Sequence, residues 1–306
     1  MSNLRVSTSP HIHDSSTTSR IMLDVLIALV PAFIAAVWIF GARAALVTAV
    51  CTAACVIFEW AFNKIVKKPN TVGDFSACIT GVLLAFNLPV TIPLWQAVFG
   101  CAVAIILIKC LFGGLGKNFV NPAITARIVM FLAFSVTMTT WVNPIDGMTG
   151  ATPLAMIQRG EIGALPGIWD MFIGVRGGCL GETSNLALLI GGIYLMIRRV
   201  ISWHTPVSFI AVVFIFSVAL GQQPVHQLFG GGLFLGAIFM ATDYVTCPQT
   251  NLGRFIFGIG CGLFTVLFRF FSSYPEGVSF AILLMNILTP YINKFTMSRP
   301  LGGVSA

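Results

Sequence analysis

Charged residues are scarce in this sequence. Only 9% of its 306 residues are Asp, Glu, Lys or Arg, whereas 57% are hydrophobic. A soluble domain carries about 25% charged residues, so the composition excludes an ordinary soluble protein and predicts an integral membrane protein in contact with lipid. The net charge of +7 is informative about membrane orientation and gives no indication of nucleic-acid binding.

The signatures of several enzyme classes are also absent. The four histidines are scattered and form no HExxH pattern. The eight cysteines form no CxxC pair, which predicts small buried side chains and neither a disulfide framework nor an iron–sulfur ligand set. Gly-rich stretches at 113–118 and 177–184 lack the ending of a Walker A loop. The polar segment 1–20 has no apolar core of a cleavable signal peptide, so the first apolar segment is expected to direct its own insertion.

Ten apolar segments are predicted to cross the membrane as helices, each of which needs about 20 residues. They are 21–40, 44–63, 75–88, 94–112, 120–140, 185–197, 207–220, 228–245, 255–271 and 278–292. Those that begin at residues 75, 185 and 207 are short for a full crossing. Five segments precede a long loop at 141–184 and five follow it. An odd number per half requires the second half to be inserted upside down relative to the first, as in inverted-repeat transporters.

The distribution of basic residues predicts the orientation, because Lys and Arg gather on the cytoplasmic side of membrane proteins. With a cytoplasmic N-terminus, most basic residues outside the spans fall on that side, and the opposite side receives only Arg43, Arg159 and Arg176. Both termini are then cytoplasmic and the loop is extracytoplasmic. The predicted regions are a cytoplasmic segment 1–20, a first five-helix half 21–140, the loop 141–184, a second half 185–296 and a cytoplasmic tail 297–306.

Ionisable residues in or beside the spans are candidates for function, because charges are costly in lipid. They are Asp24, Glu59, Asp74, Lys109, Arg127, Asp243 and Arg269. The three aspartates lie near cytoplasmic ends of spans, where interfacial water would also explain them. Arg127 lies about two helical turns into its span and is expected to need a partner or a polar cofactor.

Six stretches of the sequence are distinctive: SPHIH at 9–13, RIMLDVLIALVPA at 20–32, GLGKNFVNPA at 114–123, GETS at 181–184, MATDYVT at 240–246 and YPEGV at 274–278. Together they resemble the NqrB/RnfD family of membrane subunits of ion-translocating oxidoreductases. The similarity covers nearly the whole chain, and the length is nearer to the RnfD members. It implies a subunit of a bacterial Rnf complex in the cytoplasmic (inner) membrane, a ferredoxin:NAD+ oxidoreductase that couples electron transfer to translocation of Na+ or H+. The sequence does not distinguish the coupling ion.

The resemblance also implies a covalent flavin in the outer loop. Members of the family carry FMN attached through its phosphate to the last residue of a Ser/Thr-Gly-Ala-Thr motif, which reads Thr149-Gly150-Ala151-Thr152 here. A separate flavin transferase would form the phosphoester with Thr152. Gly150 and Ala151 are expected to leave the Thr152 hydroxyl accessible to that enzyme, and Pro153 restricts the backbone beside it.

Further implications of the resemblance are a urea-transporter-like fold of two inverted five-helix halves and a noncovalent riboflavin. The resemblance does not assign the riboflavin contacts, but the neighbourhood of 113–121 and Arg127 and the polar end of the span at 228–245 are candidates, so Asn121 and Arg127 are candidate cofactor-binding residues. The partners would be other Rnf subunits, including a second covalent-flavin subunit and iron–sulfur membrane subunits. No catalytic residue or metal ligand is expected, because the chain alone has no complete active site.

One alternative function comes from the predicted architecture. Inverted halves are also compatible with a urea-channel-like transporter that has no redox role. In that interpretation the loop would only connect the halves, and the Thr149–Thr152 motif would have no function.

Overall fold

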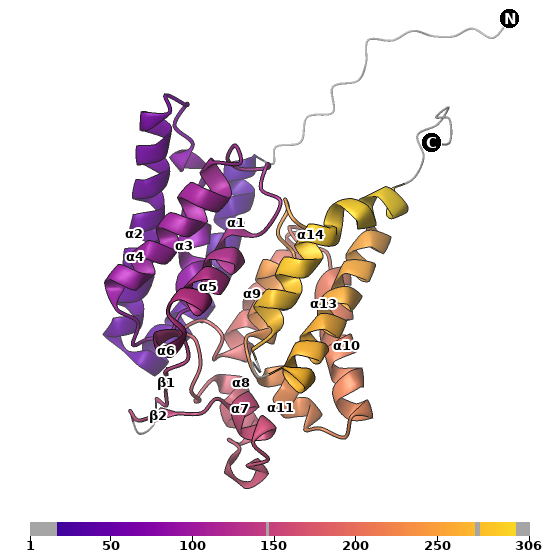
Figure 1. The fold of residues 1–306 in the computed structure, drawn as a ribbon. Helices are drawn as coiled ribbons and strands as arrows, with labels where there is room; N and C mark the ends of the chain where they lie inside the picture. Colours follow the sequence, from indigo (N-terminus) through magenta and orange to yellow (C-terminus); the bar gives the residue numbers. More distant parts are fainter. Residues whose placement is uncertain (1–16, 145–146, 273–275, 298–306) are drawn as a thin grey trace, which may run out of the picture.

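The computed structural model describes residues 17–144, 147–272 and 276–297, and these residues are almost entirely helical (Figure 1). The part before the loop contains α1 (Thr18–Phe40), α2 (Ala42–Ile65), η1 (Val72–Asp74), α3 (Ser76–Phe86), α4 (Leu94–Ala102), η2 (Val103–Cys110), α5 (Pro122–Ala133) and α6 (Ser135–Met138). The part after it contains α9 (Asn185–Ile197), α10 (His204–Ala219), α11 (Pro224–Phe229), α12 (Leu233–Leu235), η4 (Gly236–Met240), α13 (Asn251–Phe271) and α14 (Val278–Thr296).

The loop itself has short regular elements. They are β1 (Trp141–Val142), β2 (Thr149–Gly150), α7 (Pro153–Gln158), η3 (Ile162–Ala164) and α8 (Ile168–Ile173). The two strands form an antiparallel pair in which Trp141 is opposite Gly150. Predictions that concern residues 1–16, Asp146, Tyr274, Pro275 and 298–306 fall outside the described residues.

The prediction of a helical membrane protein is confirmed. Helices α1, α2, α13 and α14 are long and apolar enough to cross a membrane, and shorter apolar helices lie in the other predicted spans. Two predicted spans are interrupted. The span at 120–140 breaks at Phe134, where φ is −130° and ψ is 49° between α5 and α6. The span at 228–245 is divided at Gly230–Gly232, because Gly231 and Gly232 adopt positive φ. Apolar composition alone does not reveal these interruptions.

Two groups of helices lie side by side in Figure 1, α1–α5 on one side and α9–α14 on the other. The loop elements β1, β2, α7 and α8 lie together at one end of both groups. The start of α1 and the end of α14 lie at the other end. The loop therefore lies at the end of the molecule away from the described chain ends.

Glycines allow close contact between neighbouring helices. A Cβ added at Gly81 of α3 would lie 2.7 Å from the Thr52 Cα of α2. A Cβ added at Gly191 of α9 would overlap the Ala28 carbonyl oxygen of α1, which places these two helices in close contact across the two groups. Small residues at such crossings let backbones approach each other, which is how van der Waals packing drives helix association in a membrane.

Replacing Gly191 with Ala is therefore expected to lower stability by about 1–3 kcal/mol, the usual cost of overpacking, because α1 and α9 must move apart. Thermal unfolding of the detergent-purified protein would show a lower midpoint than the wild type. Gly163→Ala is the control, since its added methyl group would meet no heavy atom within 4 Å. Equal midpoints for the two variants would contradict the close crossing of α1 and α9.

Candidate functional site

The ionisable residues singled out in the first group of helices have polar partners. Glu59 and Lys109 form an ion pair of 2.8 Å in which both side chains are buried. Asp74 accepts a hydrogen bond from the Ser76 hydroxyl. Asp24 accepts a hydrogen bond from Tyr194 at 2.9 Å, and its other oxygen lies 3.2 Å from the Arg198 guanidinium.

Arg127 contacts both groups of helices and the loop. Its Nη1 donates to Asn87 Oδ1 at 2.7 Å, just after α3, and its Nη2 donates to Glu276 Oε2 at 3.0 Å, just before α14. The same Nη2 lies 3.6 Å from Cys179 Sγ in the loop. The expectation that this buried arginine needs a partner is confirmed, because a buried charge is costly unless it is paired.

A cavity of about 740 Å³, which we call the loop pocket, lies beside Arg127. The residues that line it come from α5, the loop and the start of α14, and include Arg127, Phe131, Trp141, Thr149, Gly150, Ala151, Thr152, Arg159, Glu276 and Phe280. The volume is within the range of about 300–1,000 Å³ typical of small-molecule sites. The structure thus brings together the whole Thr149–Thr152 motif and Arg127.

Thr152 has a structural role that the sequence analysis did not foresee. Its Oγ1 accepts a hydrogen bond from the Ala155 amide at 3.3 Å and so caps the N-terminus of α7. Thr152 is only 4% exposed, although Thr149 and Gly150 before it are exposed. The expectation of an accessible hydroxyl is therefore wrong for this conformation, because capping α7 turns the side chain inward, into the wall of the loop pocket.

The loop pocket combines positive charge with aromatic surface. The guanidinium groups of Arg127 and Arg159 contribute to its lining, together with one carboxylate, that of Glu276. Phe131 and Phe280 lie edge to face with ring centroids 6.2 Å apart, and both line the pocket. Such a lining suits a planar aromatic ligand with an anionic group, because the rings offer apolar walls and the arginines offer opposite charge.

The acidic residues at this site were missed by the sequence analysis. Burial and the nearby Glu182 carboxylate raise the pKa of Glu276, the surrounding arginines lower it, and the balance of these effects is a pKa of about 8. Burial also raises the pKa of the Cys179 thiol. Glu182 and Glu276 occur in the GETS and YPEGV stretches, but their distance in sequence hides the fact that they lie close together.

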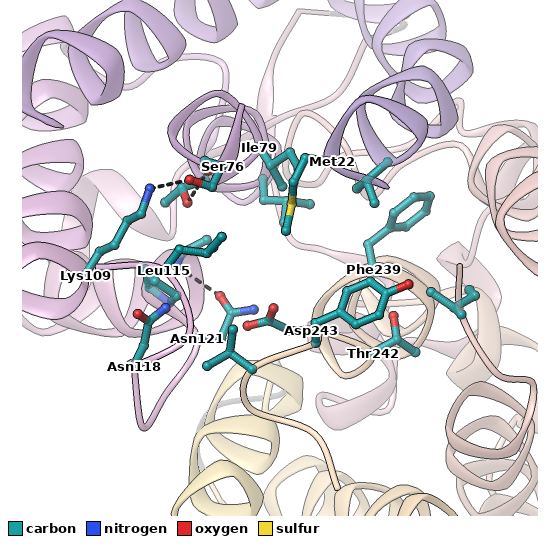
Figure 2. A pocket seen from close by; sticks show the side chains of 18 of the residues that line it. Met22, Ser76, Ile79, Lys109, Leu115, Asn118, Asn121, Phe239, Thr242 and Asp243 are labelled. Atoms are coloured by element: carbon teal, nitrogen blue, oxygen red, sulfur yellow. Dashed lines mark hydrogen bonds between the residues drawn. The ribbon is translucent and has the colours of Figure 1, made fainter. Parts of the chain in front are cut away.

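A second, smaller cavity, which we call the interhelical pocket, lies between the two groups of helices (Figure 2). Figure 2 shows Asn118, Asn121 and Asp243 together on one side of it and the hydrogen-bonded pair Ser76 and Lys109 on another. Asn121 caps α5 by accepting from the Ala123 amide at 3.0 Å. Asn121 and the polar end of the span at 228–245, two of the candidate riboflavin regions, thus line the same cavity.

Asn121 and Arg127, however, belong to different cavities. Asn121 lines the interhelical pocket, whereas Arg127 lines the loop pocket. The two candidate residues are therefore separated, since the start of α5 faces one cavity and its next turns face the other. The interhelical pocket holds about 80 Å³, well below the roughly 300 Å³ of small-molecule sites, so a flavin ring system does not fit there in this conformation.

Comparisons with known proteins find relatives that match nearly the whole chain. The chain is 47% identical over 304 residues to the D subunit of the Na(+)-translocating ferredoxin:NAD(+) oxidoreductase complex of Acetobacterium woodii, covering 98% of this chain and 96% of the relative. It is 40% identical over 318 residues to the D subunit of the proton-translocating ferredoxin:NAD(+) oxidoreductase complex of Clostridium ljungdahlii, covering 97% and 96%. It is 36% identical over 325 residues to the D subunit of the ion-translocating oxidoreductase complex of Ectopseudomonas mendocina, covering 96% and 95%.

The match to a family model extends over almost the entire sequence. The model that describes the NQR2, RnfD, RnfE family matches residues 5–302. Both this extent and the identities to the relatives support one conclusion: the chain belongs to the NQR2, RnfD, RnfE family.

Proposed function

We propose that this chain is the D-type membrane subunit of an ion-translocating ferredoxin:NAD+ oxidoreductase complex and that it carries FMN as a phosphoester of Thr152. The observation that carries the proposal is the loop pocket, where Thr152 and the rest of its motif line one cavity together with Arg127 and Arg159. The named relatives, which are D subunits of such complexes, support the assignment of the complex.

The residues of the loop pocket fit this cofactor. The Thr152 oxygen would hold the phosphate, and the Arg127 and Arg159 guanidinium groups would offset its negative charge. Phe131 and Phe280 would face the ring system and limit the access of water. FMN supplies the electron-transfer chemistry when it is bound, and the chain holds it and sets its surroundings.

For the cofactor to be attached, the loop must either open again after folding or receive the flavin before it packs against the helices. Thr152 is almost fully buried, and its hydroxyl caps α7. A flavin transferase must reach that oxygen, so α7 would have to be displaced from its place beside the pocket. Thr149 and Gly150, which are exposed, would be the part of the motif that the transferase meets first.

The proposed setting is the bacterial cytoplasmic membrane. Two inverted five-helix halves would place the loop on the outer face, with both termini in the cytoplasm. The loop lies at the end of the helices opposite to the described chain ends, which supports this orientation. Other Rnf subunits, including a second covalent-flavin subunit and iron–sulfur membrane subunits, would deliver and accept electrons. Ferredoxin and NAD would bind elsewhere in the complex.

A urea-channel-like transporter is the alternative, and the interhelical pocket favours it. Polar side chains from both groups of helices, among them Ser76, Asn121 and Asp243, meet in that cavity. A channel without a redox role would need no modified threonine. The two functions therefore differ in whether Thr152 carries a flavin.

Covalent flavin on Thr152 is tested by coexpressing the chain with a flavin transferase. After denaturing electrophoresis, the wild-type band is expected to fluoresce under ultraviolet light, and Thr152→Ala is expected to lose the signal completely because it has no oxygen for the phosphoester. Thr140→Ala, which removes another hydroxyl in the wall of the same pocket, is the control and keeps the signal. A dark wild-type band would contradict the proposal and favour the channel.

Positive charge at the loop pocket is expected to raise the reduction potential of the flavin, because it stabilises the added electron. Arg159→Gln should therefore lower the one-electron potential by roughly 40 mV, equivalent to a Coulomb interaction of about 1 kcal/mol at a solvated site. Redox titration of the purified complex measures the shift. Lys117→Gln, an exposed position outside the pocket, should leave the potential unchanged. An unchanged potential in Arg159→Gln would place the cofactor away from this arginine.

A further inference from the structure

Two carboxylates lie close together beside the loop pocket, that of Glu182, which is buried, and that of Glu276, which is partly buried. Glu276 lines the pocket, and Glu182 lies in the segment that precedes α9. One oxygen of each carboxylate and the Cys179 sulfur all lie within 4.8 Å of one another. Glu182 is 2% exposed, so water does not solvate its charge.

Each carboxylate has one oxygen without a hydrogen-bond partner in the described part of the chain. Glu182 Oε1 accepts from the Cys179 amide at 3.2 Å, and Glu276 Oε2 accepts from Arg127. Glu182 Oε2 and Glu276 Oε1 have no such partner. Unpaired buried oxygens are costly, and two adjacent carboxylates resist ionising together. A single shared proton relieves both costs, because it neutralises one charge and supplies a donor.

Positive groups face this pair from three parts of the chain. They are Arg127 of α5, Arg176 of the loop and Arg269 of α13. Arg176 donates to the Glu182 backbone oxygen at 2.9 Å, and Arg269 donates to the Gly230 backbone oxygen at 2.9 Å. A metal ion between the carboxylates would be repelled by these groups, and Arg127 already occupies the Cys179 sulfur and one oxygen of Glu276. A proton adds positive charge without needing a ligand shell.

We propose that Glu182 and Glu276 hold one shared proton and that Glu276 delivers it to the loop pocket when an electron arrives there. The delivery step rests on the proposed flavin at Thr152. One electron comes from a partner redox centre of the complex. The O–H bond of Glu276 would break, its bonding electrons would stay on the carboxylate, and the proton would pass to the proton acceptor that the bound cofactor would supply in the loop pocket.

The arginines explain how the pair tolerates the loss of its proton. After delivery both carboxylates are ionised, and Arg127, Arg176 and Arg269 offset the two negative charges. The pair regains one proton from the aqueous phase, which reaches the pocket beside the exposed residues Thr149 and Arg159. Over the whole cycle one electron and one proton enter the pocket, so the net charge of the pocket is the same before and after. Cys179 stays a neutral thiol, because burial raises its pKa.

The shared proton is tested by infrared spectroscopy of the oxidised complex at a series of pH values. The wild type is expected to show a carboxylic-acid band that disappears as the pH rises through about 8, the pKa of Glu276, and shifts in D2O. Glu276→Gln should remove the band. Glu182→Gln should move its midpoint to lower pH, because the charge that raises the Glu276 pKa is gone. Glu161→Gln, an exposed loop position, is the control and should match the wild type.

Delivery is tested by the rate of flavin reduction in the same complexes. In Glu276→Gln the rate of flavin reduction should fall at least tenfold, in line with the loss of a general acid. Glu276→Asp should recover part of that rate. The wild-type rate should fall as the pH rises through about 8, and the Glu276→Gln rate should not depend on pH there.

The possible failures are distinguishable. A wild-type spectrum without the titrating band, or a band unchanged in both Glu182→Gln and Glu276→Gln, overturns the shared proton. A wild-type rate in Glu276→Gln overturns the delivery. Flavin fluorescence on denaturing gels is read for the wild type and for every variant. A wild-type chain without covalent flavin contradicts the proposed function, whereas the infrared test of the carboxylate pair stays valid.

Discussion

A guanidinium buried among the helices is the constraint on which the arrangement around the loop depends. Arg127 is held by Asn87 at the end of α3, by Glu276 at the start of α14 and by Cys179 in the loop. Removing one partner of a buried ion pair leaves an uncompensated charge, which costs about 3–5 kcal/mol. These three parts of the chain are therefore fixed relative to α5, beside the loop pocket that Arg127 and Glu276 line.

Helix α5 connects the two cavities of the molecule. Asn121 caps its first turn at the interhelical pocket, and Arg127 reaches the loop pocket. At 1.5 Å per residue, these positions are about 9 Å apart along the helix axis. A movement of α5 along its axis would therefore affect both cavities at once. If the loop carries the proposed flavin, one short helix would link a redox event there to a change in the polar cavity.

The helical membrane architecture could be predicted because apolar composition and segment length are local properties. The Thr149–Thr152 motif was found through the family resemblance, and the structure places all of it in the lining of one cavity, while its role as a flavin site stays a prediction. The helix interruptions at Phe134 and at Gly231 and Gly232 could not be predicted, because they depend on backbone angles that hydropathy does not encode. Burial of Thr152 and the approach of Glu182 to Glu276 arise only when the loop folds onto both groups of helices.

The cap of α7 has a consequence for how the unmodified chain behaves. Thr152 uses a lone pair of its hydroxyl oxygen to accept from the Ala155 amide, whereas formation of a phosphoester consumes the hydrogen of that hydroxyl. The acceptor survives esterification, so the same oxygen can hold the helix and the phosphate. The bare protein and the flavin-loaded protein can therefore share one loop conformation. Folding of the loop is then an intrinsic property of the polypeptide, and under the proposed function a copy without the flavin would fold normally but would carry no electrons.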